Sequence, residues 1–84
     1  MGTSAFEYLV CVSQLGKVIF VNNQWQGGVG GPHSSEPHDR MLDSCPELTS
    51  FLNQAGADGW ELVSAYSLSL EHGVMEKLIL KRSR

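Results

Sequence analysis

The sequence has few cysteines, and it has no long hydrophobic run. Its 84 residues include two cysteines, Cys11 and Cys45. That is too few for the disulfide framework of a small secreted protein, and no secretory leader precedes them. None of the apolar stretches approaches the roughly 18 residues that a membrane-spanning helix needs. We therefore expect a cytoplasmic protein that does not enter a membrane.

The sequence also lacks an excess of positive charge. Six lysines and arginines stand against nine aspartates and glutamates, which gives a formal net charge of −3. Non-specific binding to nucleic acid relies on clustered basic residues. The basic C-terminal stretch LKRSR is short, so nucleic acid is not an expected partner.

The composition is that of a globular protein, with 42% hydrophobic and 18% charged residues. Residues 1–84 are enough for a single domain but not for a second core. A chain of this length buries only about 60–65% of its unfolded surface. A partner chain would therefore add useful stability.

The hydrophobic pattern predicts four strands and one helix. Residues 5–14 and 15–23 alternate between two faces and are joined by a turn at Gly16, which is typical of a β-hairpin. Residues 60–68 and 73–82 form a second pair of predicted strands. The expected fold is α+β, with a four-stranded, mainly antiparallel sheet and one helix on one face, in the order β-β-α-β-β.

The predicted helix has recognisable ends. Ser44 and Glu47 have capping-box spacing, and Pro46 falls in the expected first turn. Its apolar stripe comprises Cys45, Leu48, Phe51, Leu52 and Ala55. We expect Gly56 to end the helix with a positive φ, Gly59 to allow a tight turn into the next strand, and Trp60 to fold back over the helix end.

Residues 23–43 break the pattern. This segment holds four of the nine glycines and two of the three prolines, which predicts a long flexible loop. Its glycine run lacks the spacing and the following Lys-Ser or Lys-Thr of a phosphate-binding loop.

The first hairpin is apolar on both faces, although one helix can cover only one of them. The face expected to be left open would form a homodimer interface made of Leu9, Cys11, Ile19 and Val21. The opposite face would carry Tyr8, Val10, Val18 and Phe20. The alternative is that the 23–43 loop folds over the open face.

Three segments, in this order, resemble a small bacterial family known as domain of unknown function 4177. They are FEYLVCV at 6–12, FLNQAGADGWELVSAYS at 51–67 and LILKR at 78–82. The resemblance implies a compact α+β unit and supplies no catalytic residue. The segment from about 23 to 40 is longer than the link usual in that family, so an activity particular to this chain would lie there.

Several residues of the loop are of types that bind metals: His33, Glu36, His38 and Asp39, followed by Cys45. Their spacing fits no closed zinc site, and prolines interrupt it. We expect a solvated polar loop there, and neither a metal nor another cofactor.

The candidates for catalysis are equally weak. Cys11 lies mid-strand among apolar neighbours, where a thiol is inert, and Cys45 is the better reactive candidate because a helix N-terminus favours thiolate. Glu61 beside Trp60 could act as an acid, but strand alternation favours an outward side chain paired with Lys77 or Lys81. No catalytic residue is assigned, and an enzyme is not the favoured interpretation.

Trp25 stands between polar residues and has no evident core role. Exposed tryptophans are enriched where partners bind, so the predicted contact site for a larger protein comprises Asn23, Gln24, Trp25, Gln26 and His33. The sequence thus predicts a small, homodimeric protein-binding or regulatory module. The alternative is a small-molecule site or minor enzyme, with a pocket between sheet and loop lined by Tyr8, Trp25, Tyr66 and a histidine.

Overall fold

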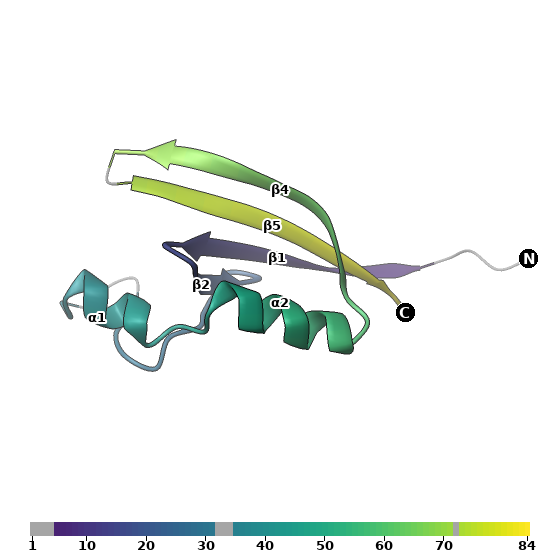
Figure 1. The fold of residues 1–84 in the computed structure, drawn as a ribbon, viewed down its shortest axis with the longest axis horizontal. Coiled ribbons are helices and arrows are strands. Elements are labelled where there is room, and N and C mark those ends of the chain that lie inside the picture. Colours follow the sequence, from purple (N-terminus) through teal and green to yellow (C-terminus); the bar gives the residue numbers. More distant parts are fainter. Residues whose placement is uncertain (1–4, 32–34, 72) are drawn as a thin grey trace, which may run out of the picture.

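The computed structural model describes residues 5–31, 35–71 and 73–84 (Figure 1). The α+β class and the antiparallel sheet are confirmed, but these residues form five strands and two helices rather than four and one. In chain order the elements are β1 (Phe6–Gln14), β2 (Lys17–Val21), β3 (Gln24–Trp25), α1 (His38–Asp43), α2 (Leu48–Ala57), β4 (Glu61–Leu70) and β5 (Gly73–Ser83).

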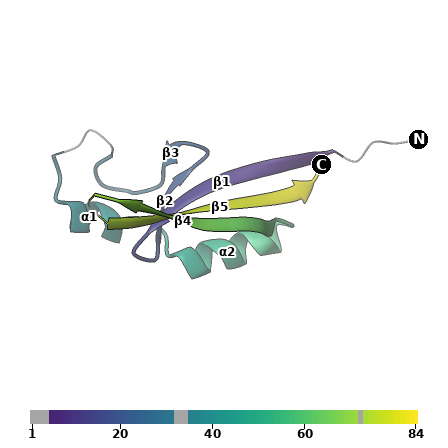
Figure 2. The same cartoon turned by 90° about the horizontal axis from the view of Figure 1, so that it is seen from above.

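The sheet has the order β3-β2-β1-β5-β4, and every neighbouring pair is antiparallel. The central strand β1 pairs with β5 from Phe6↔Ser83 to Ser13↔Glu76. Figure 2 shows the start of β1 and the end of β5 side by side at one end of the sheet. The long strand β4 forms one edge, and the two-residue β3 lies at the other.

Two tight turns with left-handed backbone build the β1-β2-β3 meander. Leu15 and Gly16 have φ values of 52° and 77°, and Asn22 and Asn23 have 49° and 68°. Positive φ at both central residues matches the right-handed twist of the flanking strands. The Gly16 turn was predicted. The Asn22-Asn23 turn was not predicted. It leads the chain back along β2 as β3, the strand that was missing from the predicted four.

The pairing of β1 with β2 contains an irregularity that separates residues expected to share a face. The register shifts between Val12, which lies opposite Phe20, and Ser13, which lies opposite Val18. Ile19 is thereby left as an extra residue on β2, which is the arrangement of a β-bulge. The predicted common face of Leu9, Cys11, Ile19 and Val21 is therefore wrong at Ile19.

The core consists of two clusters, one for each helix. The first contains Cys11 and Val18 of the hairpin with Ala55 of α2, and α2 adds its stripe of Leu48, Phe51 and Leu52. The second joins Ile19 to Leu42 of α1 and to Cys45, with Val12, Phe20, Trp25 and Met75 around them. Because Cys11 and Val12 are consecutive strand residues, the clusters lie on opposite faces of β1.

The helix α2 begins later than predicted. Its N-cap is Glu47, which makes no side-chain capping bond, so the predicted capping box is wrong. The chain before the helix pairs instead with β2: the Val18 N–H donates to the Pro46 carbonyl at 2.9 Å and the Leu48 N–H to that of Gly16 at 2.8 Å. These bonds hold the backbone extended where the capping box would need a helical turn.

The end of α2 is also displaced from the prediction. Gly56 lies inside the helix, and Gly59, with φ 92°, is the left-handed residue after it. The Gly59 N–H donates to the Gly56 carbonyl and the Trp60 N–H to that of Ala55, both at 3.0 Å. This pair of bonds is a Schellman motif. Gly59 therefore performs both tasks that the sequence analysis divided between two glycines.

One arginine fastens this helix end to the sheet. The Arg82 guanidinium lies 4.4 Å from the centre of the Trp60 ring, so the tryptophan packs at the helix end as predicted. The Nε of Arg82 donates to the Glu7 carboxylate of β1 at 2.9 Å, and a terminal nitrogen of the same guanidinium donates to the Asp58 carbonyl at 3.0 Å. Stacking, an ion pair and a bond to a C-terminal carbonyl thus join α2, β1 and β5.

Candidate functional site

The strand β4 is the most exposed element of the structure. All ten of its residues are exposed, although half of them are large and apolar. The exposed fractions are 47% for Leu62, 46% for Val63, 45% for Tyr66, 41% for Leu68 and 49% for Leu70. Such a concentration on one element of a small protein marks a surface that binds another molecule.

The position of β4 in the sheet explains its exposure. Both helices pack against β2, and β1 and β5 lie between β2 and β4. Figure 1 shows β4 across the sheet from both helices. The helices therefore cover one half of the sheet and leave the β4 half open.

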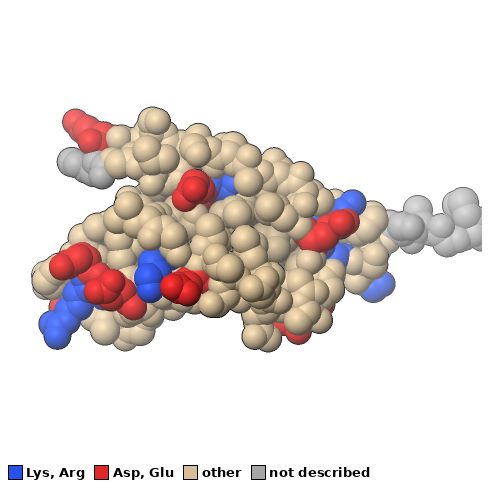
Figure 3. All heavy atoms as spheres, viewed as in Figure 1, with Lys and Arg blue, Asp and Glu red and all other residues tan. Residues whose placement is uncertain are grey.

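Few of the features that usually protect a sheet edge are present on β4. Its single charge is Glu61 at the first position, whose carboxylate lies 3.8 Å from the Lys81 ammonium, as predicted. A register shift between Leu62 and Ser64 bends its beginning. From Ser64 to Leu70 there is neither charge nor proline. In the view of Figure 3 the surface over β4 is largely free of charged side chains.

A second candidate is a half-open cavity of about 280 Å³ between the sheet, α1 and Gly31. Its apolar lining includes Ile19, Phe20, Trp25, Met41, Leu42 and Met75. Gln14, Gly31 and His38 complete it. A pocket between sheet and loop was the alternative prediction, and of the four residues named for it Trp25 and a histidine line this one. Tyr8 and Tyr66 lie elsewhere.

Trp25 has a core role that sequence reasoning missed. It pairs with Phe20 in the sheet, and the two rings meet edge-on, with centroids 5.7 Å apart. The side chain is half-buried and packs against the cluster around Ile19. The expectation that Trp25 lacks a core role is therefore wrong, and its contact with a partner stays a prediction. Its neighbourhood carried a usable signal, because Asn-Asn favours a hairpin turn that would bring the tryptophan back onto β2.

Three other residues of the predicted contact site lie together at the turn between β2 and β3 and just after β3. Asn23 lies in the turn and Gln24 on β3, and both are exposed. Gln26 uses its amide to donate to the Gln24 carbonyl at 3.0 Å. His33 lies outside the described residues. Contact of these residues with a partner stays a prediction.

Two side chains of the cavity lining each carry an unpaired polar atom that is closed off from the cavity. The amide oxygen Oε1 of Gln14 and the indole nitrogen Nε1 of Trp25 are buried, and neither has a hydrogen-bond partner among the described residues. Gln14 as a whole is only 7% exposed. Buried polar groups are nearly always paired in folded proteins, so these two atoms are exceptions to the rule.

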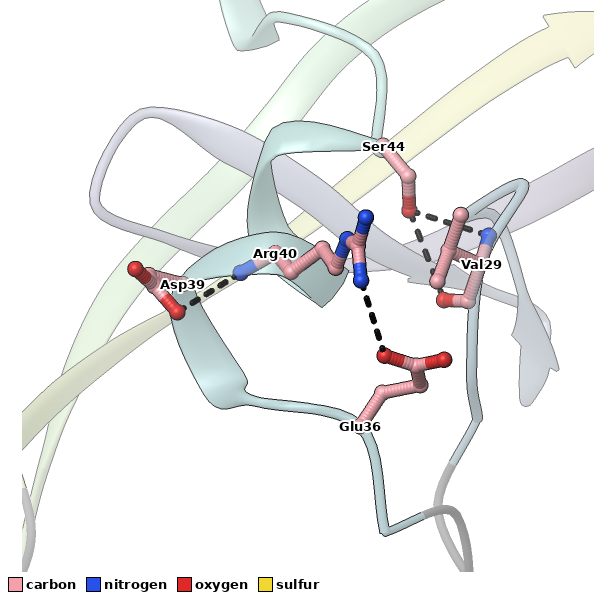
Figure 4. Close-up of polar contacts among 5 residues, drawn as sticks. All are labelled: Val29, Glu36, Asp39, Arg40 and Ser44. Atoms are coloured by element: carbon pink, nitrogen blue, oxygen red, sulfur yellow. Dashed lines mark hydrogen bonds and ion pairs between the residues drawn. The ribbon is translucent and has the colours of Figure 1, made fainter.

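The wall of the cavity is held by polar contacts around α1 (Figure 4). The Ser44 hydroxyl donates to the Met41 carbonyl at 2.6 Å and accepts from the Val29 N–H at 3.2 Å, tying the segment after β3 to the helix end. The segment after β3 passes close to both Ser44 and Trp25. A Cβ added at Gly27 would lie 2.6 Å from the Ser44 hydroxyl and 2.6 Å from the Trp25 ring. The wall therefore depends on a glycine at this point.

The loop residues considered as possible metal ligands form no cluster in the described part of the chain. Among residues 5–31, 35–71 and 73–84, no three of the histidines, cysteines and carboxylates lie close enough to hold a metal ion. Glu36 pairs with Arg40 at 3.7 Å, and Asp39 accepts from the Arg40 N–H at 2.9 Å (Figure 4). These residues shape α1, which occupies part of the segment predicted to be a loop.

Both cysteines are free, buried thiols. Burial raises the pKa of Cys11 to about 11, in keeping with its expected inertness. Burial also raises the pKa of Cys45, against weaker opposing effects of Ser44 and Lys17. Cys45 precedes α2 by three residues, so the predicted activation by a helix N-terminus is wrong.

The four residues of the predicted dimer interface contribute to the core of the single chain. Cys11 is fully buried beneath α2, and Ile19 is 4% exposed in the cluster beneath α1. Leu9 and Val21 are half-buried against the first cluster. These positions offer little surface to a second copy, and dimerisation itself stays a prediction.

The chain was compared with known proteins. No family model, curated protein or solved structure matches it. The resemblance to domain of unknown function 4177 therefore stays a prediction. Within the described part of the chain, no helix has the length and apolar character to cross a membrane.

Proposed function

We propose that this protein is a small non-enzymatic association module of the cytoplasm, which forms a homodimer through the free edge of β4. The observation that carries the proposal is an edge strand whose ten residues are all exposed and which is uncharged from its second residue onward. The surface differs from the one that the sequence suggested, but the class of function is the same.

Pairing would satisfy two needs of β4 at once. An edge strand presents a row of backbone N–H and C=O groups that another strand can bond. The same contact would remove the apolar side chains Tyr66, Leu68 and Leu70 from water. Each square ångström of apolar surface buried contributes about 25 cal/mol.

A second copy is the occupant that suits this strand. In an antiparallel pair related by a twofold axis, a strand meets itself. Centring the pair on Ser67 would place Tyr66 opposite Leu68 of the partner on one face and Ala65 opposite Ser69 on the other. The middle of the strand carries no charge, so self-pairing brings no like charges together. The result would be a continuous sheet through both chains.

The test is sedimentation equilibrium on the wild type and two matched variants. Leu68→Lys places a charge in the middle of the edge, and Leu15→Lys makes the same change at the exposed turn between β1 and β2. Leu15 is 79% exposed and belongs to neither core cluster. We expect wild type and Leu15→Lys at twice the chain mass, and Leu68→Lys at the chain mass, because an edge lysine opposes strand pairing.

Two results would refute the proposal. One is a wild type that stays at the chain mass up to millimolar concentration. The other is a Leu68→Lys dimer as stable as that of Leu15→Lys, which would place association on another surface. Hetero-association with a strand of a different protein would appear as a wild-type monomer that binds the partner only through an intact β4.

A further inference from the structure

We propose that the homodimer forms in a single register, in which residues 64–70 of β4 pair with the same residues of the second copy and Ser67 lies on the twofold axis. This register rests on the proposed function and adds to it the segment by which one chain recognises the other. Three features of β4 select it: the limits of its regular part, the alternation of its side chains and the charges beyond its ends.

The regular part of β4 has defined limits. Its pairing with β5 shifts between Leu62 and Ser64, so Val63 is an extra residue and the strand bends there. From Ser64 the pairing is regular as far as Leu70, where the strand ends. An antiparallel partner faces all of these residues only when the first lies opposite the last, and that arrangement puts Ser67 on the axis.

The alternation of side chains limits the other registers. A twofold axis perpendicular to the joined sheet keeps each face of β4 on the same side in both copies. Only shifts by an even number of residues then preserve the faces, because successive side chains point to opposite sides. The nearest alternatives place Tyr66 or Leu68 on the axis. Within the regular segment they pair only residues 64–68 or 66–70, so each leaves two residues unpaired.

Charges and the turn beyond the segment oppose both alternatives. With Tyr66 on the axis, pairing would have to cross the bulge and would bring Glu61 towards Glu71 of the second copy, at both ends of the contact. Like charges that face each other across strands are destabilising. The 3.8 Å contact of Glu61 with Lys81 offsets this repulsion little, because the carboxylate side chain is 69% exposed. With Leu68 on the axis, the start of the segment would face the turn that begins at Glu71.

The test is disulfide cross-linking of the full chain by diamide, a mild thiol oxidant, read on a non-reducing gel. Cys11 and Cys45 are buried and burial raises the pKa of both thiols, so an added exposed cysteine reacts first. Directly opposite Cα atoms of antiparallel strands lie about 4.5–5.5 Å apart, which a disulfide can span. Ser67→Cys should therefore give a covalent dimer.

Ser69→Cys is the matched control, because it makes the same change at another exposed serine on the same face of β4. In the proposed register its two copies lie about 13 Å apart along the strands, so it should give about tenfold less covalent dimer than Ser67→Cys. Ala65 lies opposite Ser69 of the second copy. An equimolar mixture of Ala65→Cys and Ser69→Cys should therefore cross-link, although neither variant does so alone.

A different register would give a different pattern. Ser67→Cys would cross-link to Ala65→Cys if Tyr66 were on the axis, and to Ser69→Cys if Leu68 were. Either pattern without the Ala65-Ser69 product, or equal products from Ser67→Cys and Ser69→Cys alone, would overturn the register and leave the homodimer in place. No product in any combination, from a wild type that sediments at the chain mass, would refute the proposed function as well.

Discussion

Burial decides what the single reactive side chains of this protein can do. A thiol removed from water loses the hydration that stabilises its thiolate, so the thiols of Cys11 and Cys45 stay protonated at neutral pH. Neither thiol is set up as a nucleophile. The residues of the proposed dimer contact are instead uncharged: the leucines and Tyr66 of β4.

The raised pKa of Cys11 predicts a loss of stability at alkaline pH. The thiol titrates near pH 11 when folded and near its ordinary value of 9 when unfolded. Between these values the unfolded chain binds fewer protons, so the free energy of unfolding falls with rising pH, by at most about 1.4 kcal/mol per unit. Cys11→Ala should lower stability at pH 8 but flatten this slope. Urea unfolding between pH 8 and 11 measures the free energy of unfolding of both proteins. The same dependence on pH in wild type and Cys11→Ala would contradict the prediction.

Single residues also show where sequence reasoning reached its limit. The ion pair of Glu61 with Lys81 follows from strand alternation and was predicted. Ile19 was placed on the wrong face because a bulge shifts the register by one, and alternation cannot reveal an inserted residue. Gln14 was missed because its lack of a partner arises from contacts distant in the chain.

At the scale of elements, the long periodic segments were predictable and the short ones were not. The paired strands β1-β2 and β4-β5 have clear alternation over many residues, and α2 has a stripe at helical spacing. The strand β3 has two residues and α1 has six, too few for any period to show. Both elements had local signals in the sequence. The Asn22-Asn23 turn precedes β3, and Pro37 followed by the acidic Asp39 marks the start of α1.

The two glycines at the end of α2 should respond oppositely to alanine. Gly59 has φ 92°, so Gly59→Ala strains the turn into β4 and should cost about 1–2 kcal/mol. Gly56 is helical with open space at its Cβ position, so Gly56→Ala should raise the free energy of unfolding by about 0.5–1 kcal/mol. Urea denaturation of the two variants measures both. If Gly56→Ala were the more damaging change, the helix would end where the sequence alone suggested.

At the scale of the whole molecule, the protein is a sheet covered over half its width. The helices and the segment after β3 build two small cores with β1, β2 and β5, and β4 extends beyond them. The sequence analysis found too much apolar surface for one helix to cover and inferred a partner from it. That surplus lies on β4, because α2 covers Leu9, Cys11 and Val21 and α1 covers Ile19.

A homodimer built on β4 makes thermal stability depend on protein concentration. A partner that binds only the folded chain stabilises it by mass action, so each tenfold rise in concentration should raise the Tm by about 3–5 °C for a chain of this size. Circular dichroism melts from micromolar to millimolar concentration would show this for wild type and for Leu15→Lys. The Leu68→Lys melt should lie at a lower and constant Tm, since its edge lysine prevents pairing. Superimposed wild-type melts across that range would mean that the open half of the sheet folds without a partner.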